Sequence, residues 1–262
     1  MPVVKPDGPK EAPVTTFVLI HGSWHGGWCW RKVVPLLQSR GHRVYTPTLT
    51  GLGERSHLLS PEVDLGTHIR DVCQVLEYED LGGVALVGHS YAGMVLSGVA
   101  EQMPERIGRL IYLDALVPQN GQCGFDVMPG SREGAEEAAR ARGQGWFVPP
   151  PEPQVFGVED PADVSWMKAR LCPMPLAVHE QTLQITNADA RKLPKGYLLC
   201  VGYQMFSPAA QRAKDEAVRY AKVHNWDIRE LQAPHDSMVT APRELTGLLI
   251  DMVAAPGSQL DT

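Results

Sequence analysis

Short apolar segments alternate with longer amphipathic segments along most of the chain. Six apolar segments have the length and β-branched content of strands, at residues 15–20, 43–46, 84–87, 110–113, 197–201 and 227–231. Longer segments between or after them have helical spacing, at residues 28–39, 67–79, 91–102, 208–222 and 242–254. This order predicts an α/β fold, in which a mostly parallel sheet is flanked by helices.

The alternation stops between residues 118 and 194, where glycine, proline and charged residues are dense. The run VPPPEPQ (148–154) excludes regular structure, SREGAEEAARAR (131–142) suits a solvated helix, and residues 165–183 supply apolar and aromatic groups. We therefore expect one domain that carries an inserted cap. Its predicted parts are a core at 14–117 and 195–255, a cap at about 118–194, and a loose N-terminal tail at 1–13.

Composition narrows the possible partners and compartment. The 262 residues carry a net charge of -6 without long basic runs, so nucleic acid is not an expected partner. Apolar stretches are strand-sized, far below the roughly 20 residues that cross a bilayer, and the N-terminus lacks the apolar core of a secretory signal. Five scattered cysteines without CxxC spacing favour neither a disulfide framework nor a zinc site. We expect a cytoplasmic protein with no membrane anchor.

Ser90 has the sequence context of a nucleophile. The segment VALVGHSYAGMVLSGVA (84–100) places this serine between an apolar strand and an apolar helix, with Gly88 giving the backbone room to turn. Such a turn exposes the hydroxyl above the sheet beside a helix N-terminus, where negative charge is stabilised. The motif departs from GxSxG, because Ala92 holds the last position and Gly93 follows. The alternative is a serine that only caps the helix.

The loop after the first strand, HGSWHGGWCW (21–30), is the expected partner of this turn. Acyl transfer needs two preorganised donors for a developing alkoxide, and the backbone amides of Ser23 and Tyr91 are predicted to supply them. His21 and His25 stand four residues apart, which on a helix would permit metal binding, but the flanking residues favour a loop. We therefore expect no metal there.

His235 in APHDSM (233–238) is predicted to be the general base, since it lies in a loop between the last strand and the last helix. The acid is expected to be Asp114, which ends the strand in RLIYLDALVPQ (109–119). After the strand at 197–201 no carboxylate occurs before Asp215, well into a helix. Asp227 opens its strand, and Asp236 adjoins His235 too closely in sequence to orient it. The alternative role for Asp114 is a buried cap of the next loop.

Together these motifs resemble the α/β-hydrolases related to plant methyl-ester esterases and hydroxynitrile lyases, and to bacterial carboxylesterases. The resemblance covers all but the insertion and the tails, through the segments FVLIHGSWHGGWCW, GHSYAGM, IYLDALVP and PHDSM. It implies an α/β-hydrolase fold with Ser90 as nucleophile, His235 as base, and Ser23 and Tyr91 as oxyanion donors.

The resemblance also exposes two departures. The resemblance to the plant enzymes implies an Asp after the later strand, where this chain reads GYQMFSP (202–208). The segment IYLDALVP instead resembles the arrangement in some haloalkane dehalogenases, where an acid follows the strand next to the elbow. Hydroxynitrile lyases of the group carry Lys directly after the catalytic His, where this chain has Asp236. That substitution argues against cyanide release, and a serine nucleophile argues against dehalogenation.

The expected function is therefore that of a cofactor-free carboxylesterase, acting on small hydrophobic or aromatic esters through an acyl-enzyme. Candidate substrate-binding residues are Trp24 and His25 in the first loop, and Trp146 and Trp166 in the insertion. A lyase or C–C bond hydrolase on the same fold, or a non-catalytic ligand-binding receptor, are the alternatives. The sequence leaves the oligomeric state open, with a homodimer as one option.

Overall fold

The fold centres on one parallel sheet. The structure is a computed structural model of the chain, and it describes residues 14–205 and 207–254, so the predicted tail at 1–13 lies outside the described residues. The strands run in the order β2-β1-β3-β4-β7-β8, and every adjacent pair is parallel. They are β1 (Thr16–Ile20), β2 (Arg43–Tyr45), β3 (Val84–His89), β4 (Ile107–Leu113), β7 (Lys195–Val201) and β8 (Asp227–Gln232).

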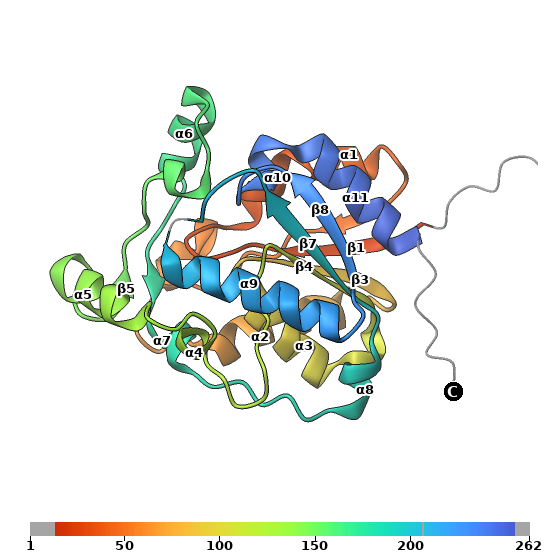
Figure 1. The fold of residues 1–262 in the computed structure, drawn as a ribbon, viewed down its shortest axis with the longest axis horizontal. Coiled ribbons are helices and arrows are strands. Elements are labelled where there is room, and N and C mark those ends of the chain that lie inside the picture. Colours follow the sequence, from red (N-terminus) through yellow and green to blue (C-terminus); the bar gives the residue numbers. More distant parts are fainter. Residues whose placement is uncertain (1–13, 206, 255–262) are drawn as a thin grey trace, which may run out of the picture.

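Helices cover both faces of this sheet, as Figure 1 shows with α2, α3 and α9 on one face and α1 and α11 on the other. Alternate residues of β1 mark the two faces. Val18 packs with the α2, α3 and α9 side, and Phe17 packs with the α1 and α11 side. The period of two along a strand thus gives two buried apolar layers. The helices are α1 (Val34–Gln38), α2 (Leu65–Tyr78), α3 (Ala92–Gln102), α9 (Pro208–Val223), α10 (Ser237–Thr240) and α11 (Pro242–Ala254).

The helix predicted at residues 28–39 is instead two short elements. A 3-10 helix, η1 (Gly27–Lys32), is followed by α1, and Val33 separates them. Pro35 lies in the first turn of α1 and has no amide hydrogen, so the hydrogen-bond ladder cannot run through this point. Two further 3-10 helices lie in core connections, η2 (Gly53–Leu58) and η3 (Pro104–Arg106).

Between β4 and β7 the chain forms short elements, and Figure 1 shows α5, β5 and α6 on the side toward which β7 and β8 point, with α8 at the other end, where β7 begins. They are α4 (Gly124–Val127), α5 (Arg132–Arg142), β5 (Phe147–Val148), η4 (Pro153–Phe156), α6 (Pro161–Lys168), β6 (Met174–Pro175), α7 (Ala177–Glu180) and α8 (Ala188–Lys192). The prediction that residues 148–154 lack regular structure was wrong at both ends. Val148 pairs with Met174, and Pro153 begins η4 because a first helical position needs no amide hydrogen.

Within the described ranges, no helix is long and apolar enough to span a membrane.

Candidate active site

Ser90 occupies a strained turn between β3 and α3. Its φ is 56°, in the left-handed region that L residues rarely adopt. Two backbone hydrogen bonds hold it against the chain that follows β4, because Ser90 N donates to Leu113 O at 3.1 Å and Leu116 N donates to Ser90 O at 3.0 Å. Gly22 approaches so closely that a Cβ on it would lie 2.9 Å from Ser90 Cβ. This geometry is typical of a nucleophile elbow.

The packing around the elbow explains why the motif ends in Ala92. Ala92 is fully buried at the start of α3 and fits there. At Gly93, in contrast, an added Cβ would lie 1.9 Å from the carbonyl oxygen of Leu116. The close backbone approach that requires glycine therefore occurs one residue later than in GxSxG.

His235 and Asp114 lie in direct contact although they are far apart in sequence. His235 follows β8, Asp114 follows β4, and His235 Nδ1 lies 2.7 Å from Asp114 Oδ2. The main chain at Asp114 is also tied to the sheet, since its N–H donates to Leu198 O at 2.8 Å. A carboxylate at Nδ1 fixes the proton on that nitrogen, so Nε2 carries the lone pair of the neutral ring.

Several groups keep Asp114 ionised in a buried place. Cys200 N donates to Oδ1 at 3.3 Å, Tyr203 Oη donates to Oδ2 at 2.6 Å, and Lys214 Nζ lies 3.1 Å from Oδ1. Burial alone would raise the pKa of Asp114, but the hydrogen bond and charge of His235, with Lys214 and Tyr203, outweigh it and lower that pKa to about 2. The supporting roles of Tyr203 and Lys214 were not predicted from the sequence.

The predicted oxyanion donors lie at the same place. Ser23 and Tyr91 both line the cavity that contains Ser90 and His235. No backbone hydrogen bond among the described residues uses the amide of Ser23 or Tyr91. Both amides are therefore available to a negatively charged oxygen beside Ser90.

Asp236, the alternative acid, binds a different histidine. Its Oδ2 lies 3.0 Å from His25 Nε2, and His25 Nδ1 lies 2.7 Å from Ser23 O. A carbonyl and a carboxylate only accept, so both nitrogens of His25 carry protons. Burial alone would lower the pKa of His25 and raise that of Asp236, but their mutual attraction reverses both shifts. His25 lines the cavity, with both ring nitrogens engaged by the protein.

Two other buried histidines are neutral braces. His21 donates from Nδ1 to Gly22 O at 2.8 Å, and its Nε2 accepts from Leu49 N at 3.1 Å. His89 Nε2 donates to His235 O at 3.1 Å. Burial lowers the pKa of each ring to about 3. No group of three or more His, Cys, Asp or Glu side chains in the described residues could hold a metal ion.

The cavity beside Ser90 has a volume of about 240 Å³ and a mainly apolar wall. The first loop, the elbow region and the segment between β4 and β7 all contribute to it, through Trp24, Leu116, Phe125, Met128, Ala135, Val148, Phe156 and His179 among others. Trp24, a predicted substrate-binding residue, lines this cavity, and its Nε1 donates to Val148 O at 3.1 Å.

Trp146 and Trp166 do not line this cavity. The Trp166 ring packs edge-on against Trp28, with ring centroids 5.1 Å apart, and the Trp146 ring contacts Phe147. Of the four predicted substrate-binding residues, these two tryptophans therefore lie outside the wall. His179, which carries no motif, is part of it.

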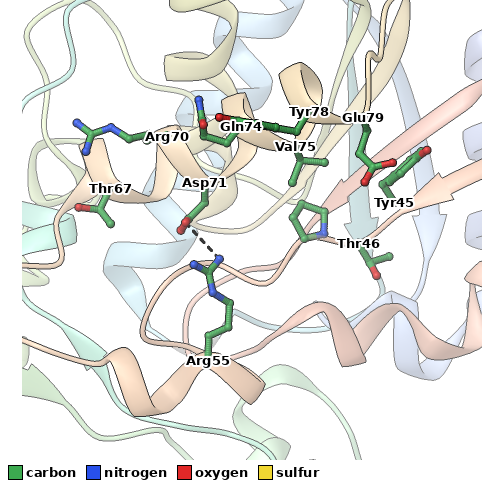
Figure 2. Close-up of a pocket in the computed structure, with 11 residues that line it drawn as sticks. Tyr45, Thr46, Arg55, Thr67, Arg70, Asp71, Gln74, Val75, Tyr78 and Glu79 are labelled. Atoms are coloured by element: carbon green, nitrogen blue, oxygen red, sulfur yellow. Dashed lines mark hydrogen bonds and ion pairs between the residues drawn. The ribbon is translucent and has the colours of Figure 1, made fainter.

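A larger groove of about 650 Å³ lies elsewhere, along the outer face of α2, as Figure 2 shows. An ion pair crosses it, with Arg55 Nη1 3.2 Å from Asp71 Oδ1. Neither Ser90 nor His235 lines this groove. The smaller cavity is therefore the candidate active site, since it alone of the two joins the nucleophile, the base and the free amides.

Comparison with known proteins agrees with this fold. Residues 17–247 match the alpha/beta hydrolase family. A carbendazim hydrolyzing esterase of Nocardioides sp. (strain SG-4G) is 38% identical over 241 residues, which cover 88% of this chain and 97% of the relative. Polyneuridine aldehyde esterase of Rauvolfia serpentina is 26% identical, over 90% of this chain and 94% of the relative. A solved pyrethroid hydrolase structure superimposes with a TM-score of 0.72 at 25% identity, over 93% of this chain and 99% of that chain.

The chain belongs to the alpha/beta hydrolase family. The similarity to a named esterase over nearly the whole of both chains further identifies it as a hydrolase of the carboxylesterase type.

Proposed function

We propose that Ser90, His235 and Asp114 form a catalytic triad that hydrolyses small, uncharged hydrophobic or aromatic esters. The observation that carries this proposal is the 2.7 Å contact between His235 Nδ1 and Asp114 Oδ2, made where His235 shares a cavity with Ser90. The contact orients the imidazole as a general base, and the elbow presents the serine hydroxyl to the same space.

The reaction follows from these positions. His235 Nε2 takes the proton of the Ser90 hydroxyl while Oγ attacks the ester carbonyl, and the Ser23 and Tyr91 amides stabilise the resulting oxyanion. The imidazolium then protonates the leaving alcohol as the acyl-enzyme forms. Water, deprotonated by His235, attacks the acyl-enzyme, and collapse of the second tetrahedral intermediate releases the acid and restores Ser90.

The wall of the cavity limits the substrate. Among the described residues its lining contains no Lys, Arg, Asp or Glu side chain, and the charge of His25 is already paired with Asp236. A charged group on the substrate would therefore lose its hydration without gaining an unpaired counterion. A volume of about 240 Å³ lies below the range of roughly 300–1,000 Å³ that holds drug-sized ligands, which favours a small ester. The activities named for the relatives make carbendazim and a pyrethroid the first compounds to test beside simple aryl esters.

The test compares wild type with Ser90→Ala on short-chain, aryl and bulky esters, carbendazim and a pyrethroid. We expect wild-type turnover with a burst of alcohol release and at least a thousandfold loss in Ser90→Ala. Equal hydrolysis by both proteins would overturn the proposal. Binding of an ester by wild type without any turnover that depends on Ser90 would instead favour the receptor alternative.

A further inference from the structure

His179 brings a polar ring into the apolar wall of the cavity. It lies on α7 in the insertion, it is 8% exposed, and its ring packs against Tyr91 and Phe125 with centroids 5.1 and 5.5 Å away. Its Nδ1 is enclosed without a hydrogen-bond partner, beside Gly124, where an added Cβ would lie 2.7 Å from that nitrogen. Since the ring lines the cavity, Nε2 is the nitrogen that a molecule in the cavity can reach.

Most other polar side chains of the wall are already engaged within the protein. Trp24 Nε1 donates to Val148 O at 3.1 Å, and His25 binds Ser23 O and Asp236. Tyr91 Oη lies 3.1 Å from His68 Nδ1, and Ser131 Oγ donates to Met128 O at 2.7 Å. No hydrogen bond among the described residues uses His179 Nε2, so this atom offers polar recognition away from Ser90 and the oxyanion loop.

The protonation of His179 decides which chemistry it offers. Burial lowers the pKa of its imidazole to about 4, so the ring is neutral at neutral pH and carries one proton. An enclosed N–H without an acceptor costs more than an enclosed lone pair, because orphaned buried donors are the rarer defect. The proton therefore resides on Nε2, and Nδ1 keeps its lone pair against Gly124.

We propose that His179 Nε2–H donates a hydrogen bond to an acceptor atom on the substrate, so that the cavity selects aromatic esters that carry a ring nitrogen or a similar acceptor. This inference rests on the proposed esterase function and adds a substrate class to it. A substrate without that acceptor displaces solvent from Nε2 and leaves the N–H unpaired, which lowers its relative affinity.

The test uses pairs of esters that differ by one ring atom. Methyl benzoate is compared with the three methyl pyridinecarboxylates, and methyl naphthoates are compared with methyl quinolinecarboxylates of the same ester position, all at neutral pH. For each pair the ratio of kcat/KM is measured in wild type, His179→Leu and His179→Gln. The ratio within one pair cancels any general loss of activity in a variant. Comparing that ratio between proteins cancels the difference in intrinsic reactivity between the two esters.

For at least one nitrogen position, we expect the ratio of aza-ester to carbocyclic ester to fall roughly three- to tenfold in His179→Leu. His179→Gln keeps an N–H donor near the position of Nε2 and is expected to retain most of the wild-type ratio. Thermal unfolding of both variants identifies any that fail to fold. A purely structural role of His179 would change both esters of a pair by the same factor.

Unchanged ratios at every nitrogen position would overturn the inference while hydrolysis remained dependent on Ser90. Loss of the ratio in His179→Gln as well as in His179→Leu would also contradict a donor role. Hydrolysis that persists in Ser90→Ala would instead overturn the proposed function, so the two failures are distinguishable.

Discussion

His25 Nε2 lies 3.0 Å from Asp236 Oδ2, and their side chains are 1% and 0% exposed. This contact connects the loop that carries the Ser23 amide with the loop that carries His235. His25 also holds the Ser23 carbonyl, and His89 holds the carbonyl of His235. The relative position of the proposed oxyanion donor and the proposed base therefore depends on one buried ion pair.

Removing one member of this pair is expected to cost more stability than removing both. His25→Leu leaves the Asp236 carboxylate buried and uncompensated, which should lower the free energy of unfolding by about 3–5 kcal/mol. Adding Asp236→Asn removes that charge and should recover at least ~1 kcal/mol. Urea unfolding of the single variants, the double variant and wild type at pH 7 measures this. A double variant as unstable as the sum of the singles would contradict the ion pair.

The pair should also make stability depend on pH. The pKa of His25 is raised in the folded protein, so its contribution is present below the unfolded value of about 6.5 and is lost as pH rises through the folded value. The difference in unfolding free energy between wild type and His25→Leu/Asp236→Asn should therefore shrink on the alkaline side. A difference that grew with pH in that range would exclude a protonated His25.

Asp114→Asn is expected to lower kcat by about 10³- to 10⁴-fold, because an amide no longer fixes the Nδ1 proton of His235 or stabilises its cation. Asp227→Asn is the matched control, since Asp227 lies at the opening of β8 and pairs with Arg229. Steady-state kinetics with circular dichroism of the folded variants measures the effect. Full activity in a folded Asp114→Asn protein would remove Asp114 from the triad.

Asp114 should also contribute to acid unfolding. Its folded pKa of about 2 lies below the unfolded value of about 3.9, so its ionised form stabilises the protein above pH 4. That contribution is lost as pH falls from about 4 toward 2. The stability of wild type should therefore drop more steeply across this interval than that of Asp114→Asn.

Ser90→Gly is expected to be more stable than Ser90→Ala, although both are inactive. A left-handed φ of 56° costs an L residue roughly 1–2 kcal/mol, which glycine avoids. Glycine also has greater conformational freedom in the unfolded chain, which offsets about 0.5–1 kcal/mol of this gain in stability. A net difference of up to ~1.5 kcal/mol should appear in paired urea titrations. A less stable Ser90→Gly would show that the turn stores no such strain.

Gly93→Ala should disturb the elbow far more than Ala92→Gly. The new Cβ would lie 1.9 Å from Leu116 O, so backbone must shift, at a cost of about 2–3 kcal/mol and most of the activity. Ala92→Gly removes only a buried methyl and some helix propensity, at a cost of about 1 kcal/mol. Equal stability of the two variants would contradict the packing argument for the shifted motif.

The local pattern of apolar and polar residues was sufficient to predict the central sheet. The alternation of strands and helices predicted all strands of the sheet, because buried parallel strands leave continuous apolar runs. The placement of Asp114 followed from a similar rule, since carboxyl ends of parallel strands meet at one edge of the sheet. The sequence motif also pointed to Ser90, whose strained turn needs small neighbours such as Gly22.

The local sequence pattern could not predict contacts between side chains that are far apart in the sequence. His25 and Asp236 are separated by 211 positions, so only the closed fold reveals that Asp236 serves another histidine. No sequence motif marks His179, although the enclosure of its Nδ1 without a hydrogen-bond partner distinguishes it in the structure. Trp146 and Trp166 are aromatic, which is typical of residues in a pocket wall. The orientation of each indole is nevertheless set by its neighbours.

The hydrogen bonds that Ser90 makes to Leu113 and Leu116 flank Asp114 on both sides. The proposed nucleophile and acid are therefore parts of one rigid body, and a movement of β3 with β4 carries both together. The alignment of the three proposed catalytic groups then depends on the position of one loop, which follows β8 and carries His235. Thermal motion, distant substitutions or the arrival of a substrate can misalign the three groups chiefly by moving that loop, which the ion pair of Asp236 restrains.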